Sequence, residues 1–362
     1  MLEKTAQNFS VRLKLFYGGF FRRAVIYVTM KPDTALTLKR IETQDQKERR
    51  ENMGEKKVGK VRILQGAVMM AAAALLLVTA APFMMRKLGT AGLFLGEMMF
   101  LLPAVLVPLA CRWNLRETFS ISMPSAGASV GAILMWIGVT RIMNVIVLTT
   151  AMLFPKLYYS QNFEQTARLA ESNWLLLIIA LAVAPALAEE ALFRGAFMSS
   201  LRPLKKKWAV ILISGILFGL FHGSPLQFAA LSVMGIMLGY VMAETRNLFY
   251  VILIHFVNNL IAAIQTIAMG DLYKYIGAYT EYSDVPAATY MEVGISCLSA
   301  VIAPACIYIG NYLLHSRTQG YRQKLLPDGR PDIVISLVAG SAGIFVWGIY
   351  LLVLGVAAVF MR

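Results

Sequence analysis

Long apolar runs separated by short polar connections fill the chain from residue 63 onward. A hydrocarbon core of about 30 Å is crossed by roughly 20 helical residues, and most of these runs have that length. Lipid offers backbone groups no hydrogen bonds, so such spans are expected to be helices. We predict an all-α, polytopic transmembrane helix bundle of about nine spans, the fifth being short enough to be tilted or partial. The spans lie near 63–84, 91–111, 127–154, 173–200, 209–222, 226–243, 248–268, 289–314 and 333–360.

The first 62 residues follow a different pattern. They contain 15 Lys and Arg against 7 Asp and Glu, with few apolar anchors after residue 30. We therefore predict a basic and largely disordered segment, in which residues 11–28 either lie on an anionic membrane surface or are solvated. No cleavable secretion signal is expected, and Met53 opens a stretch typical of an N-terminus, so we expect it to be the true start. The predicted domains are 1–62 and a membrane domain, 63–362.

Composition and charge support the membrane class. Hydrophobic residues make up 58% of the chain and charged residues only 15%, against roughly 25% charged in soluble domains. The net charge of +14 is spread over the N-terminal segment and short loops, where basic residues set topology, so no nucleic-acid partner is expected. The positive-inside rule predicts a cytoplasmic N-terminus. Cys111, Cys297 and Cys306 have no metal-ligand spacing and are interpreted as packing residues.

Ionisable residues inside the predicted spans are the candidates for chemistry, because each is costly in lipid. Glu189 and Glu190 are adjacent, so their side chains point about 100° apart on a helix and cannot share one role. Arg194 follows Glu190 by four residues, the spacing of an ion pair along one helix face. Glu189 is thereby left to face the bundle interior. The other members of this set are Glu97, Arg141, His222 and His255, with Glu97 expected to be solvated or paired.

Two further spans contribute imidazoles. Phe218 and His222 share one helix face, as do His255 and Asn259. With about 1.5 Å rise per residue, Glu189, His222 and His255 fall roughly 16, 20 and 10 Å from the cytoplasmic ends of their spans. A buried carboxylate with an imidazole can hold and deprotonate water, and a second imidazole with an amide can stabilise an oxyanion. The set therefore suits amide hydrolysis.

A metal centre is the alternative use of the same residues. Glu189, His222 and His255 could supply three ligands to zinc and leave a fourth position for water. The H-E-x-x-H spacing of soluble metalloproteases is absent from the sequence. We favour a reaction that requires no cofactor, with a divalent metal as the alternative.

At these residues the chain resembles the CAAX-processing and bacteriocin-processing intramembrane protease family (CPBP, also called Abi). Its signatures E-E-x-x-x-R, F-x-x-x-H and H-x-x-x-N/D stand here as Glu189-Glu190…Arg194, Phe218…His222 and His255…Asn259. The resemblance covers roughly residues 125–268. It implies an eight-helix core around a polar cavity that opens towards the cytoplasm, with Glu190 and Arg194 as a supporting ion pair.

By the same resemblance, Glu189 is the base, His222 binds the water, and His255 with Asn259 stabilises the oxyanion. Members of the family are commonly labelled metalloproteases. The function expected is an intramembrane endopeptidase that cleaves a membrane-associated protein or peptide precursor, such as a prenylated CAAX protein or a pheromone or bacteriocin precursor. The chain is expected in a bacterial cytoplasmic membrane. A non-catalytic membrane scaffold or regulator and a proton-coupled transporter are the alternatives, and the sequence predicts no oligomeric state.

Overall fold

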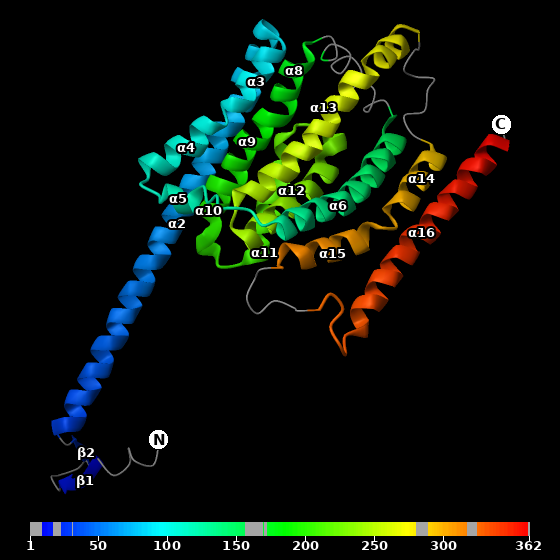
Figure 1. The fold of residues 1–362 in the computed structure, drawn as a ribbon. Helices are drawn as coiled ribbons and strands as arrows, with labels where there is room; N and C mark the ends of the chain where they lie inside the picture. Colours follow the sequence, from blue (N-terminus) through cyan, green and yellow to red (C-terminus); the bar gives the residue numbers. More distant parts are fainter. Residues whose placement is uncertain are drawn as a thin grey trace. The chain divides into compact units, whose positions relative to one another are not determined.

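The computed structural model describes residues 9–16, 23–30, 32–155, 169, 172–279, 289–316 and 324–360 (Figure 1). The chain divides into two compact units, Met1–Val61 and Arg62–Arg362. Each unit is described by itself.

The first unit contains secondary structure where the sequence predicts a largely disordered segment. Strands β1 (Phe9–Phe16) and β2 (Arg23–Met30) pair antiparallel, and helix α2 (Pro32–Leu88) starts directly after them. Apolar and polar residues alternate along β1, a pattern that favours a strand. The charged part of α2 is rich in Lys, Arg, Glu and Gln, which lose little side-chain freedom in a helix. The prediction for residues 1–8 and 17–22 lies outside the described residues.

The second unit is helical in every element that the structure describes, which confirms the predicted all-α membrane bundle. Among the residues that the structure describes, eight helical segments are long and apolar enough to cross a membrane, and Lys207–Phe221 is a shorter apolar helix, as the sequence predicts for the fifth span. After α2 come α3 (Thr90–Met98), α4 (Leu101–Ala110), α5 (Leu115–Thr118), α6 (Ala126–Leu153), the composite segment Trp174–Leu204, α11 (Lys207–Phe221), α12 (Pro225–Thr245), α13 (Leu248–Tyr279), α14 (Tyr290–Ala300), α15 (Ala303–Leu314) and α16 (Pro331–Phe360).

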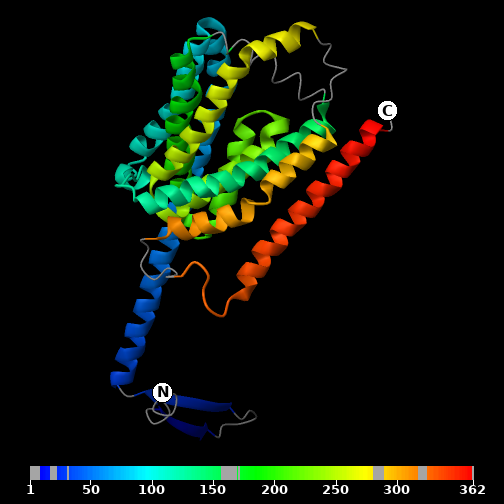
Figure 2. The ribbon, with the colours of Figure 1, turned by 45° about the vertical axis from the view of Figure 1, so that its right-hand side comes forward.

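Glycines set the closest helix crossings. A Cβ placed on Gly131 of α6 would come within 2.5 Å of the Gly310 carbonyl oxygen on α15, so these helices touch backbone to backbone. Figures 1 and 2 both show α6 and α15 side by side. Helices α11 and α12 approach in the same way, since a Cβ on Gly235 would meet the Gly215 carbonyl oxygen at 2.7 Å. Small residues allow this approach in membrane bundles, where van der Waals contact drives association.

Large apolar side chains cover the outer surface of the bundle. On α16, Val338 is 62% exposed and Val346 66% exposed, while Gly348 and Gly355 face the neighbouring α14. A soluble protein rarely exposes such a continuous apolar surface. The pattern is that of a helix with one face on the bundle and the other in lipid.

Candidate active site

The composite segment Trp174–Leu204 carries the two glutamates between two stretches of π-helix. It runs through α8 (Trp174–Ile178), η1 (Ile179–Val183, π-helix), α9 (Ala184–Glu190), η2 (Ala191–Phe197, π-helix), α10 (Met198–Leu201) and η3 (Arg202–Leu204, 3-10 helix). Single π-turns inside α-helices occur frequently at functional sites, because they re-aim side chains. Glu189 and Glu190 form the last two residues of α9.

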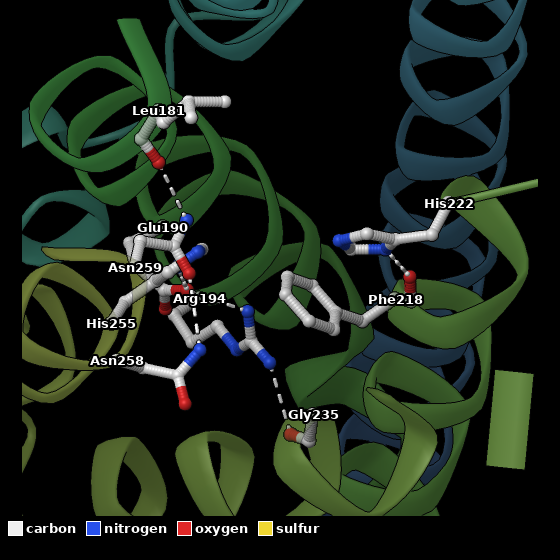
Figure 3. Close-up of polar contacts among 9 residues, drawn as sticks. All are labelled: Leu181, Glu190, Arg194, Phe218, His222, Gly235, His255, Asn258 and Asn259. Carbon is white, nitrogen blue, oxygen red and sulfur yellow. Dashed lines mark hydrogen bonds and ion pairs between the residues drawn. The ribbon is translucent and has the colours of Figure 1, made fainter. Parts of the chain in front are cut away.

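Pro185 gives a physical reason for the first π-stretch. Proline has no backbone N–H, and its ring pushes away the carbonyl four residues earlier, which here belongs to Leu181. The Leu181 carbonyl instead accepts a hydrogen bond from Asn259 Nδ2 on α13, at 3.0 Å (Figure 3). A break in one helix thus provides the acceptor that fixes a neighbouring helix.

Glu190 is the centre of a buried ion cluster. Its Oε1 accepts hydrogen bonds from Arg194 Nη1 and from His255 Nδ1, both at 2.8 Å (Figure 3). Arg194 also donates from Nη2 to the Gly235 carbonyl on α12 at 3.0 Å. Glu190, Arg194 and His255 are 0%, 1% and 3% exposed. This cluster joins three helical segments, and it orients the His255 ring through Nδ1.

Phe218 lies between the two imidazoles. Its ring centroid is 4.9 Å from that of His222 and 5.7 Å from that of His255, and the Arg194 guanidinium lies over the same ring at 4.4 Å. His222 Nδ1 donates to the Phe218 carbonyl at 2.8 Å, because a carbonyl can only accept. Its Nε2 is left with a free lone pair. Figure 3 shows this second nitrogen pointing towards the side of the site where Glu190 and His255 lie.

Two adjacent amides on α13 extend the polar network. Trp136 Nε1 of α6 donates to Asn258 Oδ1 at 3.1 Å, and Asn258 Nδ2 donates to Asn259 Oδ1 at 3.1 Å. Together with the bond to Leu181, this chain of hydrogen bonds sets the rotation of α13. The sequence interpretation did not single out Trp136 or Asn258. The signal that could have revealed the amide is its own position inside an apolar span, since polar residues there need partners.

Glu189 occupies a different environment from Glu190. It is 9% exposed, and its Oε2 is buried without a hydrogen-bond partner among the described residues. The Glu97 carboxyl of α3 lies close to it. No hydrogen bond joins Glu189 to His222 or His255 in the described part of the chain. The structure therefore brings together Glu190, Arg194, Phe218, His222, His255 and Asn259, and it adds Glu97 beside Glu189.

The donors of the predicted metal alternative do not form a metal centre in this structure. Among the described residues, no three side chains of His, Cys, Asp or Glu lie close enough to hold one ion. Glu189, His222 and His255 come from three helical segments, and Phe218 separates the two imidazole rings. These residues as placed do not fit a shared metal, and the chemistry below is derived from the side chains alone.

Comparison with known families agrees with the motifs. Residues 171–261 match the family described as type II CAAX prenyl endopeptidase Rce1-like. The matched region contains all seven motif residues and runs from the start of the composite segment into α13. Neither the curated proteins nor the solved structures gave a match. The match confirms the resemblance predicted from the motifs, and it supports a CAAX-type intramembrane protease in general.

Proposed function

With residues 171–261 matched to the Rce1-like family of type II CAAX prenyl endopeptidases, we propose that this chain hydrolyses a peptide bond within the membrane by directly activating water. The observation that carries the proposal is the cluster in which one Glu190 oxygen holds both Arg194 and His255 at 2.8 Å. Among the described residues, Glu189 Oε2 and the Nε2 atoms of His222 and His255 have no hydrogen-bond partner. Glu190 thus orients His255, and Glu189 is a separate carboxyl group that can accept a proton.

Glu189 is proposed to be the general base. Its Oε2 has no partner in the described structure, so it can accept a proton from water without breaking a hydrogen bond. His222 Nε2 is proposed to hold that water, because Nδ1 is occupied by the Phe218 carbonyl. The water oxygen then bonds to the scissile carbonyl carbon as its proton passes to Glu189. When the C–N bond breaks, Glu189 returns that proton to the leaving nitrogen.

The carbonyl oxygen gains negative charge during this attack. His255 and Asn259 are proposed to stabilise it. His255 acts as an imidazolium that donates from Nδ1 to Glu190 and from Nε2 to the oxyanion, and Asn259 donates the amide hydrogen that is not used by Leu181. One oxyanion-hole donor contributes about 2.7–4 kcal/mol to the barrier in other hydrolases. Glu190 and Arg194 act on the position of His255 and do not touch the substrate.

The substrate proposed is a membrane-associated protein or a small peptide precursor, either a prenylated CAAX protein or a pheromone or bacteriocin precursor. The reaction is proposed to proceed without a cofactor, since a carboxyl and an imidazole together supply both the water site and the base. The setting proposed is a bacterial cytoplasmic membrane with the N-terminus on the cytoplasmic side, on the grounds of charge distribution.

The test is a comparison of new peptide N-termini in native membranes that contain equal amounts of wild-type chain or Glu189→Gln. Termini that occur only with wild type, and that are also lost in His222→Ala, are the expected result. Asp328→Asn makes the same carboxyl-to-amide change on an exposed loop and should retain cleavage. Unchanged termini in Glu189→Gln would refute the base assignment and favour a scaffold or transporter. Full inhibition by a zinc chelator would refute the cofactor-free reaction.

A further inference from the structure

A cavity of about 680 Å³ lies at one end of the bundle, between the composite segment Trp174–Leu204 and helices α5, α11 and α12. Seven of its lining residues are cationic and one, Glu117, is acidic. The cations are Arg116, Arg194, Arg202, Lys205, Lys206, Lys207 and Arg246. None of the residues to which the catalytic roles are assigned above lines it.

The positive charge of this cavity is only partly compensated. Lys207 pairs with Glu244, and Arg202 lies 3.7 Å from Glu117. For Arg116, Lys206 and Arg246, no ion pair occurs within the described residues. Arg246 lies close enough to Arg202 for the two like charges to repel each other. Repulsion of this kind destabilises the empty cavity and is relieved when an anion binds.

Two of the cationic residues occupy strained backbone positions. Lys205 and Arg246 end helical segments with φ of 53° and 48°, in the left-handed region. Glycine adopts this conformation freely, whereas other L-residues lose roughly 1–2 kcal/mol there. The chain therefore carries a cation at two positions where glycine would be more stable. A cation near a helix C-terminus is favourable by itself, so these two positions alone do not identify an anion site; independent support is required.

An unpaired buried donor on one of the lining residues provides that independent support. Arg194 is 1% exposed and lines the cavity, and its Nε is buried with no hydrogen-bond partner in the described residues. Its two Nη atoms bind Glu190 and the Gly235 carbonyl (Figure 3). A buried, unpaired guanidinium donor is costly, so an anionic acceptor in the cavity would stabilise it.

We propose that this cavity binds a phosphate group, and that its source is the headgroup of an anionic lipid. Arginine guanidinium groups match phosphate oxygens in geometry and charge. The cavity lies at the ends of two candidate membrane spans, Trp174–Leu204 and Pro225–Thr245, and lipid headgroups surround the ends of such spans. The positive-inside rule assigns this end to the cytoplasmic side, where anionic lipids attract basic residues.

The binding site does not depend on the proposed proteolysis, but Arg194 links the two. The same guanidinium that lines the cavity holds Glu190, which in turn holds His255. A phosphate bound in the cavity would attract this guanidinium and compete with Glu190 for it. If the protease proposal holds, lipid composition should therefore alter the cleavage rate through the position of His255.

The test measures thermal unfolding of the purified full chain in detergent with added phosphatidylglycerol, phosphatidylcholine or sodium pyrophosphate, at matched ionic strength. Phosphatidylglycerol should raise the melting temperature and phosphatidylcholine should not. An effect of pyrophosphate equal to that of phosphatidylglycerol would assign the site to a free phosphate and overturn the lipid source.

The decisive variants are Arg246→Gly and Arg112→Gly. Both replace a left-handed arginine with glycine, so both relieve strain, but Arg112 (φ 54°) does not line the cavity. Loss of a charged donor in Arg246→Gly should weaken the apparent affinity for phosphatidylglycerol roughly tenfold, and Arg112→Gly should leave it unchanged. Equal affinities in the two variants, or equal stabilisation by both lipids, would overturn the proposal.

Discussion

Replacing Glu190 with alanine should destabilise the membrane bundle by several kcal/mol, whereas the same change at the adjacent Glu189 should have little effect on stability. Glu190 is fully buried and accepts hydrogen bonds from Arg194 and His255 on one oxygen. Glu189 has an oxygen without a partner in the described structure and lies beside another carboxyl. The two adjacent glutamates therefore allow a matched comparison, because only the change at Glu190 removes a partner from the buried ion cluster.

The magnitude follows from what the substitution leaves behind. Without Glu190, the Arg194 guanidinium remains at 1% exposure with one hydrogen-bond acceptor, the Gly235 carbonyl, among the described residues. Removing one partner of a buried charge pair costs about 3–5 kcal/mol. Neutral hydrogen bonds between membrane helices average only about 0.6 kcal/mol, so a loss above 3 kcal/mol would identify a charged cluster. For Glu189→Ala, about 0–1 kcal/mol is expected.

Unfolding by sodium dodecyl sulphate in mixed micelles measures these free energies. Glu190→Gln keeps the shape of the side chain and removes its charge. The free energy of unfolding of this variant should therefore lie between those of wild type and Glu190→Ala. Cleavage assays on the same preparations should show Glu189→Ala to be inactive but folded. If the free energies of unfolding of Glu190→Ala and Glu189→Ala differ by less than about 1 kcal/mol, the ion cluster does not stabilise the bundle and this prediction is wrong.

Four further substitutions test the packing of the bundle and the hydrogen bonds near the site. Pro185→Ala restores a backbone N–H that competes with Asn259 for the freed carbonyl, so cleavage should fall about tenfold without loss of stability; an unchanged rate would contradict this. Gly131→Ala places a Cβ against backbone at 2.5 Å and should cost about 1–3 kcal/mol in the same unfolding assay. Gly343→Ala meets no atom within 4 Å and should be neutral or slightly stabilising. Trp136→Phe removes the donor to the neighbouring amide and should cost about 1 kcal/mol, and a neutral result would show that water replaces it.

The membrane architecture could be predicted because the length of an apolar run is a local property of the sequence. The run at 209–222 was predicted to be short, and α11 (Lys207–Phe221) is indeed the shorter apolar helix. For residues 31–62, two properties of the sequence favour different outcomes. There, high charge favoured disorder, while the helix propensity of the same Lys, Arg, Glu and Gln side chains accounts for α2.

Contacts within one helix could be predicted, and contacts between helices could not. The four-residue spacing from Glu190 to Arg194 predicts their contact, because helix geometry fixes it. Which glutamate meets His255 depends on the rotation of α13 relative to the composite segment. Glu97 was expected to be solvated or paired, but nothing in the sequence identifies Glu189 as its neighbour. Such contacts depend on how closely the helices approach, and backbone contact at glycines such as Gly131 decides that.

The π-stretches explain why the two glutamates could not be assigned from periodicity alone. A 100° step per residue holds for an α-helix, but each π-stretch closes its hydrogen bonds over five residues and turns less per residue. The segments before and after Ala184–Glu190 are therefore rotated from the positions that a uniform helix predicts. In the resulting arrangement Glu190 is held by two partners, so proton uptake there would weaken both contacts. Glu189 can take up a proton without that loss, and the proposed division of roles between the two glutamates rests on this difference.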